Sequence, residues 1–293
     1  MKNSVLITGA SGQLGREWQN FFAKMGVNVT ALSSNKLDIT NPSQVEQAFV
    51  AYKPDYVINC AAYTAVDKAE EDPLAFKVNR DGVKNLALSA SRRGIKVVHY
   101  STDYVFSGSD DDRIKLPAGY PESHPCEPIN AYGKSKWEGE KMLREYCEDY
   151  IIIRVSWLCG LFGNNFVKTM LRLAGEKDHL RIINDQFGAP TFTENVVENT
   201  VALLQKDFRG VMHVSSSGLT NWYEFAEMIF AQSNKKISLE AIPSSEYPTP
   251  AKRPAFSKLD ISRLKRTEGA KIVSWNEGLE KLLLKLRKNK GIL

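Results

Sequence analysis

Val5-Leu-Ile-Thr-Gly9-Ala-Ser-Gly12-Gln-Leu-Gly15 is the stretch that decides the fold. Its apolar beginning predicts a buried strand, and its glycines predict a tight turn into a helix from about Gln13. Small residues let a phosphate approach the backbone, where the amides and the positive helix end favour an anion. A turn without a ligand has the same local pattern. The residues predicted to bind a dinucleotide here are Gly9, Ser11, Gly12, Gln13 and Leu14.

Strand-like and helix-like segments alternate through the first half of the chain. This predicts right-handed βαβ units and an α/β fold with a Rossmann-type doubly wound parallel sheet. We assign residues 1–156 to an NAD(P)-binding domain and 157–293 mainly to a smaller substrate-binding α/β lobe, with some segments returning to the first domain. Strands are expected at 5–8, 27–32, 56–59, 95–101 and 150–155, where the sheet is complete, and helices after 42 and at 73–93 and 131–147. Residues 180–183 and 211–214 are expected as strands of the lobe.

A long stretch between residues 107 and 130 interrupts this alternation. It contains four prolines and the acidic run 110–112, so we expect an irregular, exposed loop. Loops of this length in compact domains are often functional, although a variable surface insertion has the same composition.

The composition is that of an ordinary soluble globular protein, with 43% hydrophobic and 25% charged residues, and we expect a cytoplasmic location from the N-terminal pattern. No apolar run approaches the roughly 20 residues of a membrane span, and the N-terminus has no signal-peptide pattern. Four widely spaced cysteines suggest thiols rather than disulfides or a zinc site. The net charge is +5, and residues 281–290 hold five Lys or Arg. We interpret them as the solvated face of an amphipathic helix that buries Leu279, Leu282, Leu283 and Leu286, with nucleic-acid binding as the lesser alternative.

The end of the second strand bears on the choice of cofactor. An acidic residue there would hold the ribose hydroxyls of NAD, but the chain has Leu32-Ser-Ser-Asn-Lys36. Ser33 and its neighbours can accept a 2′-phosphate, so we expect NADPH, with NADH as the alternative. Asp38 and Ile39 either lie beside the adenine or, with Thr40, begin the next helix.

Tyr132-Gly-Lys-Ser-Lys136 places a tyrosine and a lysine four residues apart on one face of a predicted helix. A nearby ammonium stabilises a phenolate and lowers the pKa of the phenol, which suits proton transfer. Upstream, Ser101, Thr102 and Asp103 end a central strand, where ligands bind in open α/β sheets. Turn or helix-cap chemistry explains these three residues equally well. The glycine turn, the strand end and the YxxxK pair together predict a nucleotide-dependent reductase.

Longer strings resemble the dTDP-4-dehydrorhamnose reductase family of the extended short-chain dehydrogenase/reductase superfamily. They lie in both halves of the chain, and the GxxGxxG spacing is similar as well. The strings are Asn59-Cys-Ala-Ala-Tyr-Thr-Ala-Val-Asp-Lys-Ala-Glu70, Ser101-Thr-Asp-Tyr-Val-Phe106, Asn164-Asn-Phe-Val-Lys-Thr-Met170, Asp185-Gln-Phe-Gly-Ala-Pro-Thr191 and Arg253-Pro-Ala-Phe-Ser-Lys-Leu-Asp260.

The resemblance implies NAD(P)H-dependent reduction of a 4-keto-6-deoxy dTDP-sugar to dTDP-L-rhamnose, in dTDP-rhamnose and polysaccharide biosynthesis. It implies Thr102, Tyr132 and Lys136 as catalytic residues. Ala61, Ala62, Tyr63, Tyr100, Tyr132 and Lys136 would join the glycine turn, Ser33, Asp38 and Ile39 in binding the cofactor. Thr102, Asp103, Tyr104, Trp157, Asn165, Lys168 and Arg253 would bind substrate. Trp157 could instead be a core aromatic residue, and Lys168 a solvated one.

Some family members hold a divalent cation at a dimer contact. Glu17 and Glu194 match two of its ligands, but Lys285 stands where a third would be, so we expect no metal and leave a homodimer open. The rival interpretations are a related ketoreductase that makes another deoxysugar, and a non-catalytic regulatory subunit of the same fold.

Overall fold

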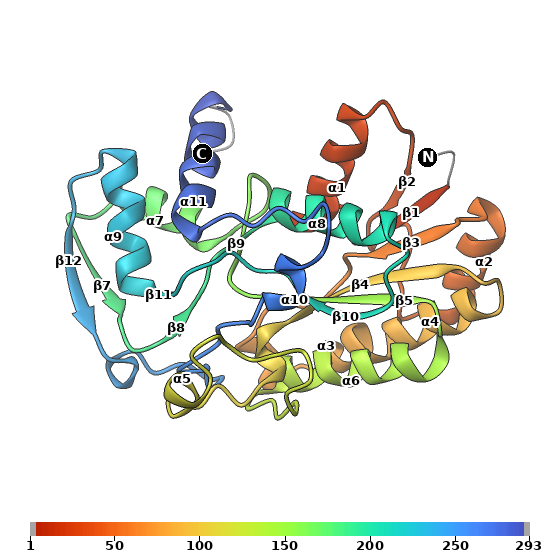
Figure 1. The fold of residues 1–293 in the computed structure, drawn as a ribbon, viewed down its shortest axis with the longest axis horizontal. Coiled ribbons are helices and arrows are strands. Elements are labelled where there is room, and N and C mark those ends of the chain that lie inside the picture. The colour runs from red at the N-terminus through yellow and green to blue at the C-terminus, as the bar shows by residue number, and fades with distance from the viewer. Residues whose placement is uncertain (1–3, 290–293) are drawn as a thin grey trace.

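The computed structural model describes residues 4–289, and its larger part is built on a six-stranded sheet, in the right half of Figure 1. All neighbouring strands are parallel. Strand β4 is buried along its whole length, as expected for a parallel sheet covered on both faces. The strands, in spatial order, are β10 (Gly210–His213), β5 (Tyr150–Val155), β4 (Lys96–Thr102), β3 (Tyr56–Asn59), β1 (Val5–Thr8) and β2 (Thr30–Leu32).

Helices cover both faces of this sheet. One face packs against α1 (Gln13–Lys24) and α8 (Thr193–Gln205), around the fully buried Trp18. The opposite face packs against α2 (Pro42–Tyr52), α4 (Val83–Ser91) and α6 (Ala131–Tyr146), around Phe49 and Leu86. The prediction of a doubly wound Rossmann-type sheet is confirmed.

The sheet does not end at β5, and this expectation was wrong. Strand β10 is not part of the lobe, because it pairs in parallel with β5, with Val211 opposite Ile152. An apolar run predicts that a strand exists, but it does not indicate with which strand it pairs. A segment from the second half of the chain is therefore part of the sheet of the first domain. The domain boundary at residue 156 stays a prediction.

Three other segments differ from expectation. Residues 73–93 form not one α-helix but α3 (Leu74–Phe76), the π-helix η2 (Lys77–Gly82) and α4. Strand β2 is three residues long rather than six. The 107–130 stretch contains the short helix α5 (Asp112–Lys115) and is not exposed throughout. Tyr120 is fully buried, stacks on Phe106 at 4.5 Å between ring centroids and donates a hydrogen bond to Asp112 at 2.6 Å, which fixes the loop.

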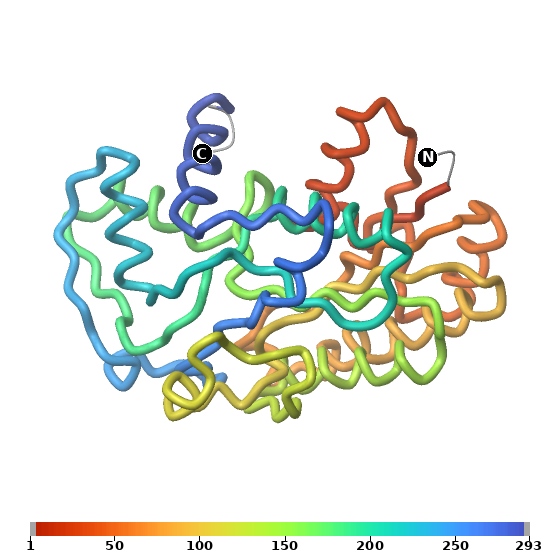
Figure 2. The backbone as a smooth tube through the Cα atoms, viewed as in Figure 1, coloured from red at the N-terminus to blue at the C-terminus, as the bar shows by residue number. Residues whose placement is uncertain are grey.

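The smaller lobe has its own apolar core beside the carboxyl edge of the sheet (Figure 2). Its largest elements are β7 (His179–Ile183), β12 (Ser238–Ile242), α7 (Phe166–Leu173), α9 (Trp222–Ser233) and α11 (Trp275–Lys288). Helix α11 buries the four predicted leucines. Short elements complete the described chain: β6 (Leu158–Cys159), β8 (Phe187–Gly188), β9 (Thr191–Phe192), β11 (Thr220–Asn221), α10 (Ser262–Lys265), η1 (Lys68–Glu70), η3 (Asp103–Val105) and η4 (Ser244–Glu246).

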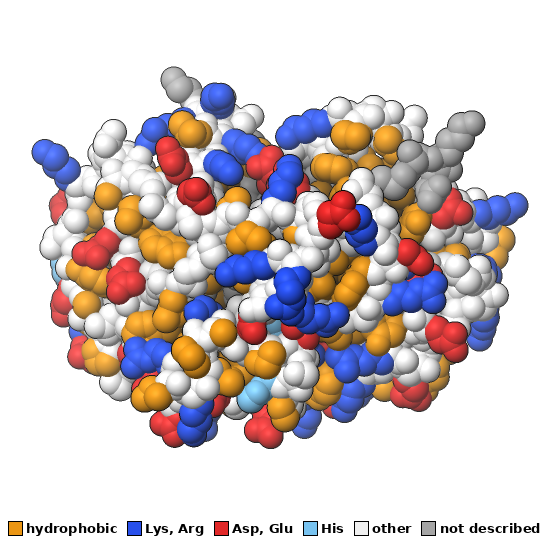
Figure 3. Space-filling view, viewed as in Figure 1, with side chains coloured by type: hydrophobic (Ala, Val, Ile, Leu, Met, Phe, Trp, Pro, Cys, Tyr) orange, Lys and Arg blue, Asp and Glu red, His pale blue; other side chains and the backbone are white. Residues whose placement is uncertain are grey.

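Charged side chains of both signs are interspersed over the face in Figure 3. Among residues 4–289, no helix combines the length and apolar character needed to cross a membrane.

Candidate functional site

The glycine turn after β1 has the geometry of a phosphate cradle. Gly9 has φ +63°, and a Cβ there would lie 2.5 Å from the amide nitrogen of Ala61. A Cβ on Gly15 would lie 2.3 Å from the carbonyl oxygen of Gly9. Helix α1 begins at Gly12 with no side chain capping it, so its first amides are free to bind an anion. These residues fit a dinucleotide pyrophosphate.

The other residues predicted to bind the dinucleotide at this turn lie in different environments. Ser11 and Gly12 are exposed at the turn, whereas Leu14 packs into the apolar core beneath α1. Gln13 donates to the carbonyl oxygen of Leu158 at 3.2 Å and accepts from Asn165 at 2.9 Å. Gln13 therefore joins the turn to the second lobe, and only the main chain of Leu14 is left to contact a cofactor.

The residues expected around the adenosine lie just beyond β2. Ser33 is partly buried and lies in a turn with the exposed Lys36, where the two residues could contact a 2′-phosphate. Asp38 is exposed and accepts from the amide and hydroxyl of Thr40 at 2.9 and 2.8 Å. Ile39 is buried against Gly82, so its side chain supports the core under this edge.

A buried asparagine that sequence reasoning missed organises the Ala61, Ala62 and Tyr63 segment. Asn79 in η2 accepts from the amide of Tyr63 at 2.8 Å and donates to its carbonyl oxygen at 3.0 Å. It also donates to the hydroxyl of Ser135 in α6 at 2.9 Å. The predicted cofactor segment is thus tied directly to the helix that carries the YxxxK pair.

Local sequence explains where α6 begins. Asn130 caps the helix by accepting from the amide of Gly133 at 2.7 Å. A Cβ on Gly133 would lie 2.1 Å from the carbonyl oxygen of Tyr104, so only glycine allows α6 to approach η3 this closely. The rings of Tyr132 and Tyr104 consequently meet edge to face, with centroids 5.7 Å apart.

The expected lowering of the pKa of Tyr132 is absent from the structure. Desolvation raises the pKa of Tyr132 to about 12, against a smaller opposing effect of the Thr102 hydroxyl. Lys136 is almost fully buried, and its Nζ donates to the carbonyl oxygen of Tyr100 at 2.6 Å rather than to the phenol. Tyr132 is therefore protonated at neutral pH, as a general acid must be.

The side chain of Tyr100 lies on the far side of β4 from Lys136. Its hydroxyl accepts from Trp18 at 2.8 Å and contacts the hydroxyl of Thr200 at 3.1 Å, both in the core beneath α1 and α8. Strand alternation causes this, because neighbouring side chains point to opposite faces. Tyr100 as a cofactor-binding residue stays a prediction, and its main chain rather than its buried hydroxyl is the part left to contact a cofactor.

Asp103 is a buried carboxyl group at the same strand end. Its Oδ1 accepts from Thr102 at 2.9 Å, and its Oδ2 has no hydrogen-bond partner among the described residues. Burial raises the pKa of Asp103 to about 7, although the hydroxyls of Thr102 and Ser257 oppose the rise. An unpartnered buried oxygen next to Thr102 is suited to a ligand hydroxyl.

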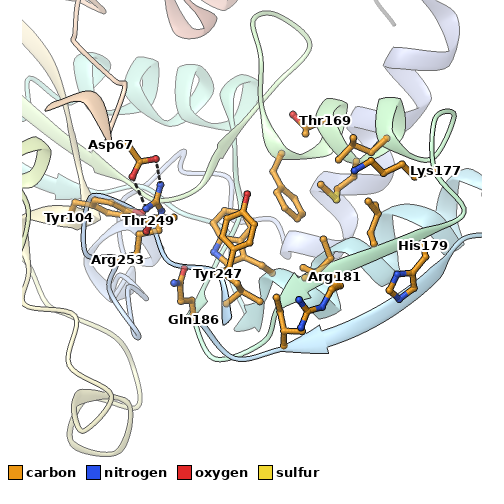
Figure 4. Close-up of a pocket in the computed structure, with 18 residues that line it drawn as sticks. Asp67, Tyr104, Thr169, Lys177, His179, Arg181, Gln186, Tyr247, Thr249 and Arg253 are labelled. Atoms are coloured by element: carbon orange, nitrogen blue, oxygen red, sulfur yellow. Dashed lines mark hydrogen bonds and ion pairs between the residues drawn. The ribbon is translucent and has the colours of Figure 1, made fainter. Parts of the chain in front are cut away.

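A cavity of about 770 Å³ opens beside Tyr104, toward the smaller lobe (Figure 4). Arg253 and Asp67 form an ion pair at its inner end, with 2.8 Å between Nη2 and Oδ2. Sequence reasoning missed most of the lining, because it comes from scattered apolar and basic positions of β7, α7 and α9. Missed lining residues include Phe166, Lys177, Arg181, Gln186, Trp222 and Tyr247.

The remaining predicted substrate residues do not all face this cavity. Trp157 has φ +44° and stacks on Trp222, with centroids 3.7 Å apart, so it supports the cavity wall. Asn165 caps α7, and Lys168 donates to the carbonyl oxygen of Gly163 at 2.9 Å, beside the glycine turn. Asn165 bonds to Gln13 of the glycine turn, and neither Asn165 nor Lys168 is among the residues that line the cavity.

The residues that match the metal ligands of other family members are not arranged to bind a cation. Glu17 accepts from Thr193 at 2.7 Å and from Asn20 at 3.1 Å. Glu194 forms an ion pair with Lys285 instead. An ammonium group already neutralises the carboxylate that a metal would need.

Chelation with EDTA is accordingly expected to leave the oligomeric state and melting temperature unchanged, because Lys285 occupies the cation's place. Size-exclusion chromatography and thermal unfolding with and without EDTA measure this. Lys285→Glu adds a third carboxylate and is the matched variant expected to respond to Mg²⁺. Dissociation of the unmodified protein by EDTA would contradict the assignment.

The parallel sheet, the uncapped glycine turn and the Thr102, Tyr132 and Lys136 cluster at one sheet edge define the extended short-chain dehydrogenase/reductase class. The family model described as "RmlD substrate binding domain" matches residues 1–288, and the chain belongs to this family.

Named relatives agree with this assignment. dTDP-4-dehydrorhamnose reductase of Escherichia coli K12 is 39% identical, over 97% of this chain and 98% of its own. Spore coat polysaccharide biosynthesis protein SpsK of Bacillus subtilis is also 39% identical, over 95% and 96%. The crystal structure of dTDP-4-dehydrorhamnose reductase from Bacillus anthracis in complex with NADP superposes with a TM-score of 0.92, at 39% identity, over 97% of this chain and all of that one.

Proposed function

We propose that this protein uses NADPH to reduce the 4-keto group of dTDP-4-dehydro-6-deoxy-L-mannose, which gives dTDP-L-rhamnose. The observation that carries the proposal is the contact of the protonated Tyr132 with the hydroxyl of Thr102, on the helix that also carries the buried Lys136. Tyr132 packs against Tyr104, which lines the cavity that contains Arg253. The family membership and the names of the relatives support the same reaction.

Different residues bind the cofactor and take part in the chemical step of this reaction. Reduced nicotinamide, when bound, supplies a hydride. The free amides at the start of α1, after Gly12, would hold the pyrophosphate, and Ser33 would contact the adenosine phosphate. Tyr132 gives its phenolic proton to the carbonyl oxygen as that oxygen gains negative charge, and Thr102 hydrogen-bonds the same oxygen.

The cavity fits the rest of the substrate. Arg253 is a cation beside Tyr104 and can bind a diphosphate, exchanging its partner Asp67 for phosphate oxygens. The apolar wall that contains Phe166 and Trp222 suits a flat base. Asp103 has an unpartnered oxygen for a sugar hydroxyl. We also propose a cytoplasmic location, with a homodimer as the candidate assembly.

The test is incubation with dTDP-4-dehydro-6-deoxy-L-mannose and either NADPH or NADH, with the product identified by NMR. We expect cofactor oxidation, dTDP-L-rhamnose as product and a higher kcat/KM with NADPH, because Ser33 stands directly after β2, where an acidic residue would favour NADH. A different deoxysugar as the product would support a ketoreductase but reject dTDP-L-rhamnose as its product. A strong NADH preference would refute the cofactor assignment, and no oxidation with either cofactor would leave the regulatory-subunit interpretation.

A further inference from the structure

The main chain around Arg253 is held on both sides by residues that are distant in the sequence. Before Arg253, the carbonyl oxygen of Lys252 accepts a hydrogen bond from Nδ2 of Asn130 at 2.8 Å. After Arg253, the amides of residues 255 and 256 both donate to the carbonyl oxygen of Gly108, at 2.9 and 3.1 Å. The main chain that carries this cation is therefore fixed independently of its side-chain partner.

The close approach at Gly108 excludes any larger residue. Gly108 has φ +67°, and a Cβ there would lie 2.3 Å from Cβ and 2.7 Å from Cα of Pro254. The amide of Gly108 donates to the hydroxyl of the fully buried Tyr120 at 3.1 Å. Tyr120 in turn forms two main-chain hydrogen bonds with residues 258–260, each of 2.9 Å. This part of the long loop therefore supports the segment that carries Arg253.

Asn130 connects the same segment to the helix of the proposed proton donor. Its Oδ1 caps α6 by accepting from the amide of Gly133 at 2.7 Å, while its Nδ2 donates to Lys252. The residue is only 5% exposed. One buried side chain thus joins the first turn of α6, where Tyr132 lies, to the residue before Arg253.

We propose that Gly108 and Asn130 are positioning residues, which hold Arg253 ready for the diphosphate of the substrate. The side chain of Arg253 pairs with Asp67 (Figure 4), and it must exchange this partner for phosphate oxygens when substrate binds. A guanidinium binds phosphate best with two aligned N–H groups, and a fixed main chain keeps that alignment while the partner changes. A cation held in advance also loses less conformational entropy on binding. Because the cation is tied to α6, the bound diphosphate sets the position of the sugar relative to Tyr132.

This inference rests on the proposed role of Arg253 in substrate binding, and its test is a binding measurement that needs no turnover. Isothermal titration calorimetry measures the Kd for dTDP. Arg253→Met should raise this Kd by at least about tenfold, because a hydrogen bond to a charged group is lost. Gly108→Ala should also raise it by about tenfold, because the new Cβ displaces Pro254 and with it the cation.

Gly94→Ala is the matched control for Gly108→Ala. Gly94 has φ +62°, but a Cβ there would meet no atom within 4 Å, so the substitution imposes similar backbone strain without displacing a neighbour. It should leave the Kd for dTDP unchanged. The Kd for NADPH should stay the same in every variant, which a general loss of structure would not allow.

Asn130→Ser tests the same role without a steric clash. Serine keeps a neutral cap for α6 but removes the donor to Lys252, so the Kd for dTDP should rise by about 3- to 10-fold. Combined with Arg253→Met, neither Gly108→Ala nor Asn130→Ser should weaken binding further, because both act through Arg253.

An unchanged Kd for dTDP in either folded variant, or a further loss in the double variants, would overturn the inference. If Gly108→Ala does not fold, Asn130→Ser alone decides. Unchanged binding by Arg253→Met would reject the diphosphate site and this inference with it. The expected binding results without any cofactor oxidation would reject only the proposed reduction and leave the positioning role standing.

Discussion

Replacing Tyr132 with phenylalanine is expected to lower kcat by about 10²- to 10⁴-fold, with NADPH binding nearly unchanged. The substitution removes only the hydroxyl that carries the transferred proton. The ring keeps its edge-to-face contact with Tyr104, and Lys136 keeps its bond to the carbonyl oxygen of Tyr100, so the site retains its shape. Stopped-flow single-turnover kinetics with NADPH measure the chemical step apart from product release.

Tyr146→Phe is the matched control, because Tyr146 is the last residue of the same helix and packs against Lys84, far from the strand ends. It should leave kcat within about twofold of the unmodified protein, as expected for a surface substitution. If Tyr132→Phe retained full kcat, another proton donor would be required. Asp103 would be the first candidate, since burial raises its pKa to about 7.

The parts of this site that the sequence predicted are those that depend on local chemistry. The turn from Gly9 to Gly15 needs small residues for close backbone packing, and Tyr132 and Lys136 share a helix face because they are four residues apart. The contact of Gly15 with Gly9 and the spacing of Tyr132 and Lys136 act within a few residues of the chain, so they are visible without coordinates.

What the sequence could not predict depends on contacts between distant segments. Asn79 is a polar residue in a helical run, and nothing local shows that it bonds to both Tyr63 and Ser135. The direction of the Tyr100 side chain follows from the strand register, which decides the face that each residue takes. Strand β10 could be recognised as a strand, but its partner β5 lies some 60 residues earlier in the chain.

Removing the charge of Glu140 is expected to have the largest effect on stability. Glu140 and Arg154 are fully buried and form a two-bond ion pair at 2.9 and 2.8 Å. Glu140→Gln leaves the Arg154 cation without a buried counter-charge, which costs about 3–5 kcal/mol when one partner of such a pair is lost. Urea unfolding followed by circular dichroism measures the change in the free energy of unfolding.

Arg144→Met is the matched control, because Arg144 also pairs with Glu140, at 3.1 Å, but is partly exposed. Solvent screening limits the loss of unfolding free energy in Arg144→Met to about 1 kcal/mol or less. Glu140 also raises the pKa of Lys136, so Glu140→Gln should shift the Lys136 titration midpoint below about 8, as ¹³Cε NMR would measure. If Glu140→Gln were as stable as Arg144→Met, Arg154 would have to be solvated or compensated by another group. The Lys136 titration and the urea unfolding of Glu140→Gln then separate the electrostatic effect of Glu140 on Lys136 from its effect on the stability of α6.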